Sequence, residues 1–126
     1  TPGNYKLDGV SYLPALMQKT ISERPDMFWH FPGYLGAGPN TYRTTPVSVI
    51  RSGNWKLLEF LEDGKLELYD ISKDIGEKND LSKSNAEKTS ELAQKLRAWR
   101  IAINAPMPTK NTPKPSPTQN RKKKKN

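Results

Sequence analysis

Three apolar segments of strand length, separated by two short turns, constrain the fold of this chain more than any other feature. The segments cover residues 47–51, 55–61 and 66–71, and the turns between them contain Ser52-Gly53-Asn54 and Glu62-Asp63-Gly64. Asp63-Gly64 favours a two-residue type I′ hairpin, because both central residues of that turn need a positive φ. The pattern therefore predicts an antiparallel meander of three strands.

The third segment has the alternation of a half-buried strand. Leu66 and Leu68 alternate with more polar positions, Tyr69 among them, so we expect one face of the sheet to be dry. A dense aromatic run at 27–31, followed by Pro32-Gly33, is typical of a further buried strand that ends in a turn. The sheet is therefore predicted to have three or four strands.

One helix is expected to follow, over about residues 85–103. Ser84, with Glu87 three residues later, forms a capping-box pattern at its start. A stripe of large apolar residues recurs at helical spacing: Leu92, Leu96, Trp99 and Ile103. We expect all four to be buried on the dry face of the sheet, with Trp55 and Trp99 in the core. The predicted fold class is α+β, a small antiparallel sheet packed by one C-terminal helix.

Composition divides the chain into three parts. Residues 1–26 are expected to be a linker from a domain that precedes this sequence, and residues 27–108 hold the sheet and the helix. Residues 109–126 are rich in proline and lysine and are predicted to be a disordered tail. The formal net charge of +8 arises almost entirely in the tail, because 14 basic and 13 acidic residues nearly balance before Lys110.

Several classes of site find no support in the sequence. The chain has no cysteine and one histidine, which excludes disulfides, thiolate metal sites and a zinc site made of several histidines. Asp70 and Asp74 imitate the start of a calcium loop, but Ile75 and Leu81 stand where an EF-hand needs Gly and Glu. We therefore predict no metal site, and interpret Asp70 as a turn residue. No apolar run approaches the roughly 18 residues of a membrane span.

Several segments together resemble the C-terminal subdomain of the sulfatase family. They are Phe28-Trp29-His30-Phe31-Pro32, the run from Pro46 to Leu57, Leu66-Glu67-Leu68-Tyr69-Asp70, the run from Asp74 to Leu81, and the helix as far as Trp99. Residues 8–16 are similar to the segment that links the catalytic domain of a sulfatase to this subdomain. The resemblance covers about residues 7–108.

The resemblance implies a parent enzyme that hydrolyses sulfate esters, located in the periplasm or outside the cell. Its alkaline-phosphatase-like α/β domain would use a calcium ion and a formylglycine nucleophile, made from the first residue of a Cys/Ser-x-Pro-x-Arg motif. This sequence contains no such motif. We therefore expect no catalytic residue, metal or cofactor in this segment, and no activity from it alone. Its expected partners are the catalytic domain and a sulfated small molecule or glycan.

Four residues are candidates for substrate binding at the edge of the parent's pocket. His30 is followed by a loop, 32–46, that is rich in glycine and proline, and Tyr34 lies within that loop. Arg51 and Lys56 flank the first hairpin turn and could hold a sulfate or a sugar carboxylate. The alternative for His30 is a structural histidine under the sheet, and for Arg51 and Lys56 a solvent-exposed position or a local ion pair.

Two other functions remain open at this stage. Arg121 and the lysines at 122–125 could bind a polyanion or nucleic acid weakly, although no aromatic residue is interleaved with them for base stacking. The ordered part could also be a free-standing carbohydrate-binding module. The sequence does not distinguish steroid, aryl and glycan sulfates as substrates.

Overall fold

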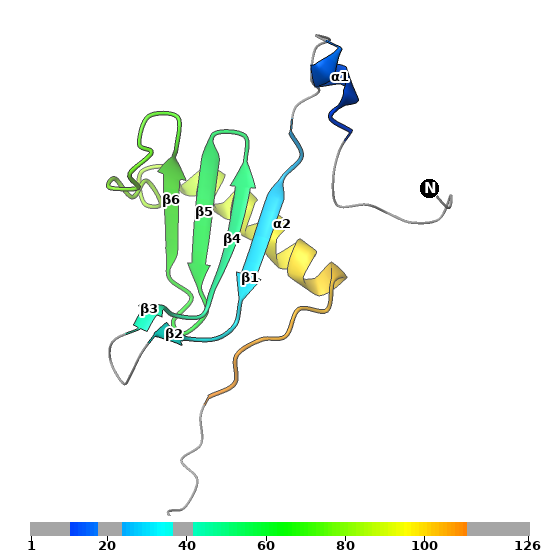
Figure 1. The fold of residues 1–126 in the computed structure, drawn as a ribbon. Helices are drawn as coiled ribbons and strands as arrows, with labels where there is room; N and C mark the ends of the chain where they lie inside the picture. Colours follow the sequence, from blue (N-terminus) through cyan, green and yellow to red (C-terminus); the bar gives the residue numbers. More distant parts are fainter. Residues whose placement is uncertain (1–10, 18–23, 37–41, 111–126) are drawn as a thin grey trace, which may run out of the picture.

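The computed structural model describes residues 11–17, 24–36 and 42–110. Four strands form an antiparallel sheet in the order β1-β4-β5-β6, and helix α2 crosses one face of it (Figure 1). The elements are α1 (Leu13–Leu16), β1 (Met27–Phe31), β2 (Leu35–Gly36), β3 (Tyr42–Thr44), β4 (Val47–Ser52), β5 (Trp55–Phe60), β6 (Leu66–Asp70) and α2 (Ala86–Ala102). The predicted α+β class and the fourth strand are confirmed. The predicted tail from residue 109 lies almost wholly outside the described residues.

The two hairpins of the meander close differently. Ser52 pairs with Trp55, so the β4–β5 loop has two residues, and Gly53 at φ +56° suits the first position of a type II′ turn. Between β5 and β6, Gly64 N donates to Phe60 O at 2.9 Å and Gly64 has φ +74°. The predicted type I′ turn is wrong here. A longer loop places only Gly64 at positive φ, and the Asp63 carboxylate accepts from Lys65 N at 2.9 Å.

The core lies between the sheet and α2, on what we call the inner face of the sheet. Its fully buried side chains come from three neighbouring strands and from two turns of the helix: Ile50, Leu57, Leu68, Leu92 and Leu96. Trp55 and Trp99 pack against this core, although both are only partly buried. The ring of Trp99 stacks on Phe28, with 4.9 Å between centroids and 8° between planes.

Two details of the helix prediction are wrong. Ile103 is 52% exposed, because α2 ends at Ala102 and Ile103 is already the C-cap residue. The N-cap is Asn85, whose side chain accepts from Lys88 N, and not Ser84. The Ser84 hydroxyl instead donates to Leu81 O at 3.3 Å, which closes the turn before the helix. Glu87 lies in the first turn, where a negative charge suits the helix dipole.

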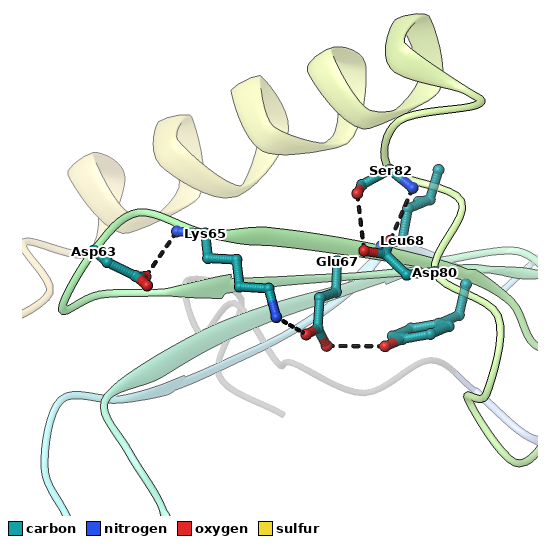
Figure 2. A network of polar contacts seen from close by, with 7 residues as sticks. Asp63, Lys65, Glu67, Leu68, Asp80 and Ser82 are labelled. Atoms are coloured by element: carbon teal, nitrogen blue, oxygen red, sulfur yellow. Dashed lines mark hydrogen bonds and ion pairs between the residues drawn. The ribbon is translucent and has the colours of Figure 1, made fainter.

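The segment after β6 folds back along the outer edge of that strand (Figure 2). The Asp80 carboxylate accepts from Leu68 N at 3.1 Å and from Ser82 N at 2.8 Å, and Leu81 N donates to Leu68 O at 2.8 Å. Burial disfavours the charged form of Asp80, but the N–H donors of Ser82 and Leu68 hold its pKa below the ordinary value. Both outward-facing backbone groups of Leu68 are thereby paired.

The last two residues of β6, Tyr69 and Asp70, differ in their burial and hydrogen bonding. Asp70 accepts from Ser72 N at 3.1 Å and from the Ser72 hydroxyl at 2.6 Å, which confirms it as a turn residue. Tyr69 is only 7% exposed, and its hydroxyl donates to Glu67 at 2.9 Å. Burial, helped by the hydrogen bond to Glu67, raises the pKa of Tyr69. Tyr69 was expected on the solvent-exposed face of the sheet, opposite Leu66 and Leu68. Its burial shows that the prediction of only one buried face is wrong at this position.

Candidate functional site

The four predicted site residues lie in two regions of the molecule. His30 and Tyr34 are at the end of the sheet where β1 finishes, next to the segment that leaves α2. Arg51 and Lys56 are partners across the β4–β5 hairpin, on the face of the sheet that α2 does not cover. The structure does not bring the four together into one site.

His30 belongs to a polar network at the inner face of the sheet. His30 Nδ1 is 2.8 Å from the hydroxyl of Ser48, which is fully buried, and Arg100 Nη1 donates to the same hydroxyl at 3.0 Å. Arg100 Nη2 lies 2.8 Å from Glu59 Oε2, and both side chains are 9% exposed. No N–H is aligned with that oxygen, so the contact is an ion pair without a well-directed hydrogen bond.

The partners of His30 determine where its protons are. Nε2 is 2.7 Å from the backbone carbonyl oxygen of Pro106, which can only accept, so Nε2 carries a proton. In the neutral ring, Nδ1 then accepts from the Ser48 hydroxyl, whose oxygen accepts from Arg100. Both nitrogens are thus bonded within the chain, and His30 ties the segment after α2 to β1.

Tyr34 lies in a hollow beside the same segment. Its ring packs against Tyr42, with 4.7 Å between centroids, and its hydroxyl donates to Glu62. This hydrogen bond to Glu62 raises the pKa of Tyr34 above its ordinary value. The hollow has a volume of about 550 Å³, which is within the usual range for small-molecule pockets. It is lined by Tyr34, Pro46, Leu61, Glu62, Pro108, Thr109 and Lys110. Residues after α2 therefore contact the surroundings of both His30 and Tyr34.

Arg51 and Lys56 line a groove of about 400 Å³ with Trp29. Lys56 Nζ pairs with Glu77 Oε1 at 2.6 Å, which supports the local ion pair considered for it. Arg51 is exposed, and its Nε only approaches Gly53 O, at 3.5 Å. An exposed indole beside a guanidinium can hold a sugar ring and an anionic group, or an apolar protein surface with a carboxylate.

Glu77 is held in place by an unusual backbone conformation. Its φ is +53°, a left-handed value that a non-glycine residue adopts at some cost. Asp74 fixes the loop by accepting from Lys78 N and Asn79 N, both at 2.8 Å. These hydrogen bonds, that from Asn79 first, hold the pKa of Asp74 below the ordinary value. The loop thereby presents the Glu77 carboxylate to Lys56 at the edge of the groove.

Comparison with known proteins shows which proteins this chain is similar to. No family model matches the chain. A curated sulfatase of Formosa agariphila is 36% identical, and the match covers 84% of this chain and 20% of that protein. This chain is related to the sulfatases. It matches their C-terminal subdomain, as the sequence resemblance predicted, and spans about a fifth of the length of the relative.

Solved sulfatase structures share the fold. A protein of Bacteroides thetaiotaomicron described as a sulfatase superposes with a TM-score of 0.61 at 24% identity, over 82% of this chain and 22% of that one. A second structure, in complex with its substrate D-glucosamine-2-N,6-O-disulfate, has a TM-score of 0.61 at 25% identity. The match covers 84% of this chain and 22% of that one. The sheet with its crossing helix is therefore a sulfatase-type subdomain fold.

Four residues of these two regions were not predicted from the sequence: Trp29, Ser48, Glu59 and Arg100. Two signals could have found three of them, Trp29, Glu59 and Arg100. Glu59 lies two residues after Leu57 in β5, so both must face α2, and Arg100 lies four residues after Leu96 on the buried stripe of α2. Because Glu59 is negatively charged and Arg100 positively charged, their positions on the two facing surfaces indicate a buried ion pair. Trp29 lies between Phe28 and His30, so its side chain must point to the opposite face.

The described part of the chain offers no metal centre and no membrane helix. Among residues 11–17, 24–36 and 42–110, no three His, Asp or Glu side chains lie together in a way that could hold a metal ion. No helix in the same residues is long and apolar enough to cross a membrane.

Proposed function

We propose that this chain is the C-terminal subdomain of a larger sulfatase, in which it completes the fold and helps to line the substrate cleft. The observation that carries the proposal is the pattern of coverage: 84% of this chain matches a sulfatase, but only 20% of that sulfatase is matched. A subdomain of a larger enzyme gives this asymmetry. The parent protein would hydrolyse sulfate esters in the periplasm or outside the cell.

The catalytic groups of the family do not fit this segment. The full sequence has no cysteine and no Ser-x-Pro-x-Arg, so it cannot supply a formylglycine. The described residues do not offer a ligand set for calcium either. The hydrated aldehyde would provide the nucleophilic oxygen and the cation would balance charge on the sulfate, and both belong to the remainder of the parent enzyme. This segment contributes binding surface and stability.

Substrate contacts are proposed for the end of the sheet that carries His30 and Tyr34. Arg51 and Lys56, the other two candidates, lie in the groove beside Trp29, where Lys56 already pairs with Glu77. The hollow beside Tyr34 combines an aromatic ring, a carboxylate and Lys110, which suits a sulfated sugar. The substrate named for one similar structure is a disulfated glucosamine, which supports a sulfated glycan here. His30 would act by fixing the segment that lines this hollow, since both its ring nitrogens have partners within the chain.

A chimera tests the proposed function. In it, this sequence replaces the matching fifth of the Formosa agariphila sulfatase. We expect the chimera to hydrolyse a chromogenic aryl sulfate, whereas the isolated chain should show no turnover at any calcium concentration. The matched control is the same sulfatase truncated before the replaced segment. Turnover by the isolated chain that survives further purification, or a folded chimera without activity, would contradict the proposal.

A further inference from the structure

The sheet has a second apolar face, which we call the outer face. Along each strand, the residues that alternate with the inner-face positions point away from α2. Eight of these outer-facing residues are apolar or aromatic: Met27, Trp29, Phe31, Val47, Val49, Leu58, Phe60 and Tyr69. An antiparallel sheet with one face in water normally alternates apolar and polar residues. This sheet has the pattern of one that is covered on both faces.

The outer-face residues form continuous rows across the strands. Trp29 is paired with Val49, and Val49 with Leu58. Phe31 is paired in the same way with Val47, and Val47 with Phe60. Cross-strand neighbours of this kind form one apolar surface, because their side chains are about 5 Å apart. The two rows run from the edge strand β1 to the centre of the sheet.

Among residues 11–17, 24–36 and 42–110, no helix covers the outer face, although the loop after β6 reaches its β6 side, where Tyr69 is only 7% exposed. Helix α2 lies entirely against the opposite face (Figure 1). On the inner face, Ile50 and Leu57 are fully buried, whereas on the outer face Trp29 is 50% and Phe31 is 40% exposed. Even Val49 and Leu58, at the centre of the sheet, are only partly buried. An exposed apolar surface of this extent is typical of an interaction site.

We infer that the outer face is the docking surface for the larger domain of the same sulfatase polypeptide. This inference rests on the proposed function and adds which side of the subdomain meets the rest of the enzyme. The length of the relatives supports this occupant, because about four-fifths of a sulfatase lies outside the matched part. A domain of that size can cover a whole sheet face, as obligate interfaces do.

Charged groups at one end of the outer face specify how the larger domain is oriented. Lys56 is neutralised by Glu77, whereas Arg51 has no carboxylate partner among the described ion pairs. Trp29, which belongs to one of the apolar rows, lines the groove described above together with Arg51. A surface that covers the outer face therefore needs an apolar centre and a carboxylate opposite Arg51, with which a guanidinium can pair in a bidentate manner.

Lysine substitutions in the chimera test the docking surface. Trp29→Lys and Val49→Lys place a charge on the outer face, and Ile101→Lys is the control, because Ile101 is 80% exposed on α2. We expect either outer-face variant to reduce the yield of soluble, active chimera at least tenfold and to speed proteolytic release of the subdomain. Ile101→Lys should change neither. In the isolated chain, all three variants should unfold at the same urea concentration as the unmodified chain.

The outcomes separate the two proposals. An active chimera that tolerates both Trp29→Lys and Val49→Lys would overturn the docking surface and leave the proposed function standing. A stable dimer of the isolated chain that both substitutions dissociate would assign the outer face to a second copy, and would also overturn it. An unmodified chimera that folds but is inactive would count against the proposed function, and with it the partner inferred here.

Discussion

Removing one member of the Glu59–Arg100 pair should be among the most destabilising single changes in this chain. The charged groups are 2.8 Å apart and both side chains are 9% exposed, so neither ion can be fully hydrated if its partner is lost. In Glu59→Leu, Arg100 stays buried at the inner face, with Arg97 as a like-charged neighbour. In Arg100→Met, Glu59 keeps only Arg97, at 3.6 Å and 59% exposed.

The expected loss follows from the degree of burial. Breaking a fully buried pair costs about 3–5 kcal/mol, because an uncompensated charge remains in a medium of low polarity. This pair lies at the margin of the core and keeps some contact with water, so we expect about 3 kcal/mol from each single change. The double variant Glu59→Leu/Arg100→Met leaves no buried ion. Its loss should fall below the sum of the singles by about 2 kcal/mol or more.

Urea unfolding of the four proteins in this cycle, followed by far-ultraviolet circular dichroism and tryptophan fluorescence, measures these free energies. The matched control is the exposed pair Lys88–Glu91 on the same helix, whose side chains are 31% and 44% exposed. Its coupling energy should be below about 1 kcal/mol. Single changes at Glu59 and Arg100 that each cost under about 1 kcal/mol, and that add in the double variant, would refute the reasoning.

Two further predictions concern His30 and the carboxylates around β6. His30→Ala should lower the free energy of unfolding by about 1–2 kcal/mol, because the buried Ser48 hydroxyl loses its acceptor. If His30 instead acts mainly on substrate, kcat/KM of the chimera should fall tenfold to a hundredfold without a change in its unfolding midpoint. Folding lowers the pKa values of Asp70, Asp74 and Asp80. The stability that these groups contribute is present above the unfolded pKa of about 4, and is lost as the pH falls through the folded values. Urea midpoints measured from pH 6 to pH 2 should decline, with a smaller decline in Asp80→Asn, whose amide oxygen can still accept from Leu68 N; an equal decline in both proteins would contradict this.

The sequence predicted the elements of the fold well, because they depend on local periodicity. The three β segments and the stripe containing Leu92 and Leu96 each give a signal within a few residues. The details that failed depend on where an element ends: the cap is Asn85, and Ile103 lies beyond the last turn of α2. Periodicity identifies a face, but it does not fix the last residue that packs on it.

The surroundings of the candidate residues could not be predicted in the same way. His30 was singled out as the only imidazole, but its partners Ser48 and Pro106 are 18 and 76 residues away in the chain. Arg100 reaches Ser48 across 52 residues. Such contacts depend on how α2 crosses the sheet, and a single sequence contains no local signal for the crossing. The spacing of Glu59 from Leu57 in β5, and of Arg100 from Leu96 in α2, nevertheless places both charged residues on the surfaces where the sheet and the helix face each other.

The segment that folds back on β6 also affects how this sheet behaves toward other chains. A β-sheet can grow by strand recruitment wherever its outermost backbone groups are free, which is how domain-swapped oligomers and fibrils propagate. The outward N–H and C=O of Leu68 are already taken by Asp80 and Leu81, at 3.1 and 2.8 Å. Among the described residues, Asp80 and Leu81 thus block the addition of another strand at the middle of β6, where an edge strand would otherwise offer its backbone groups.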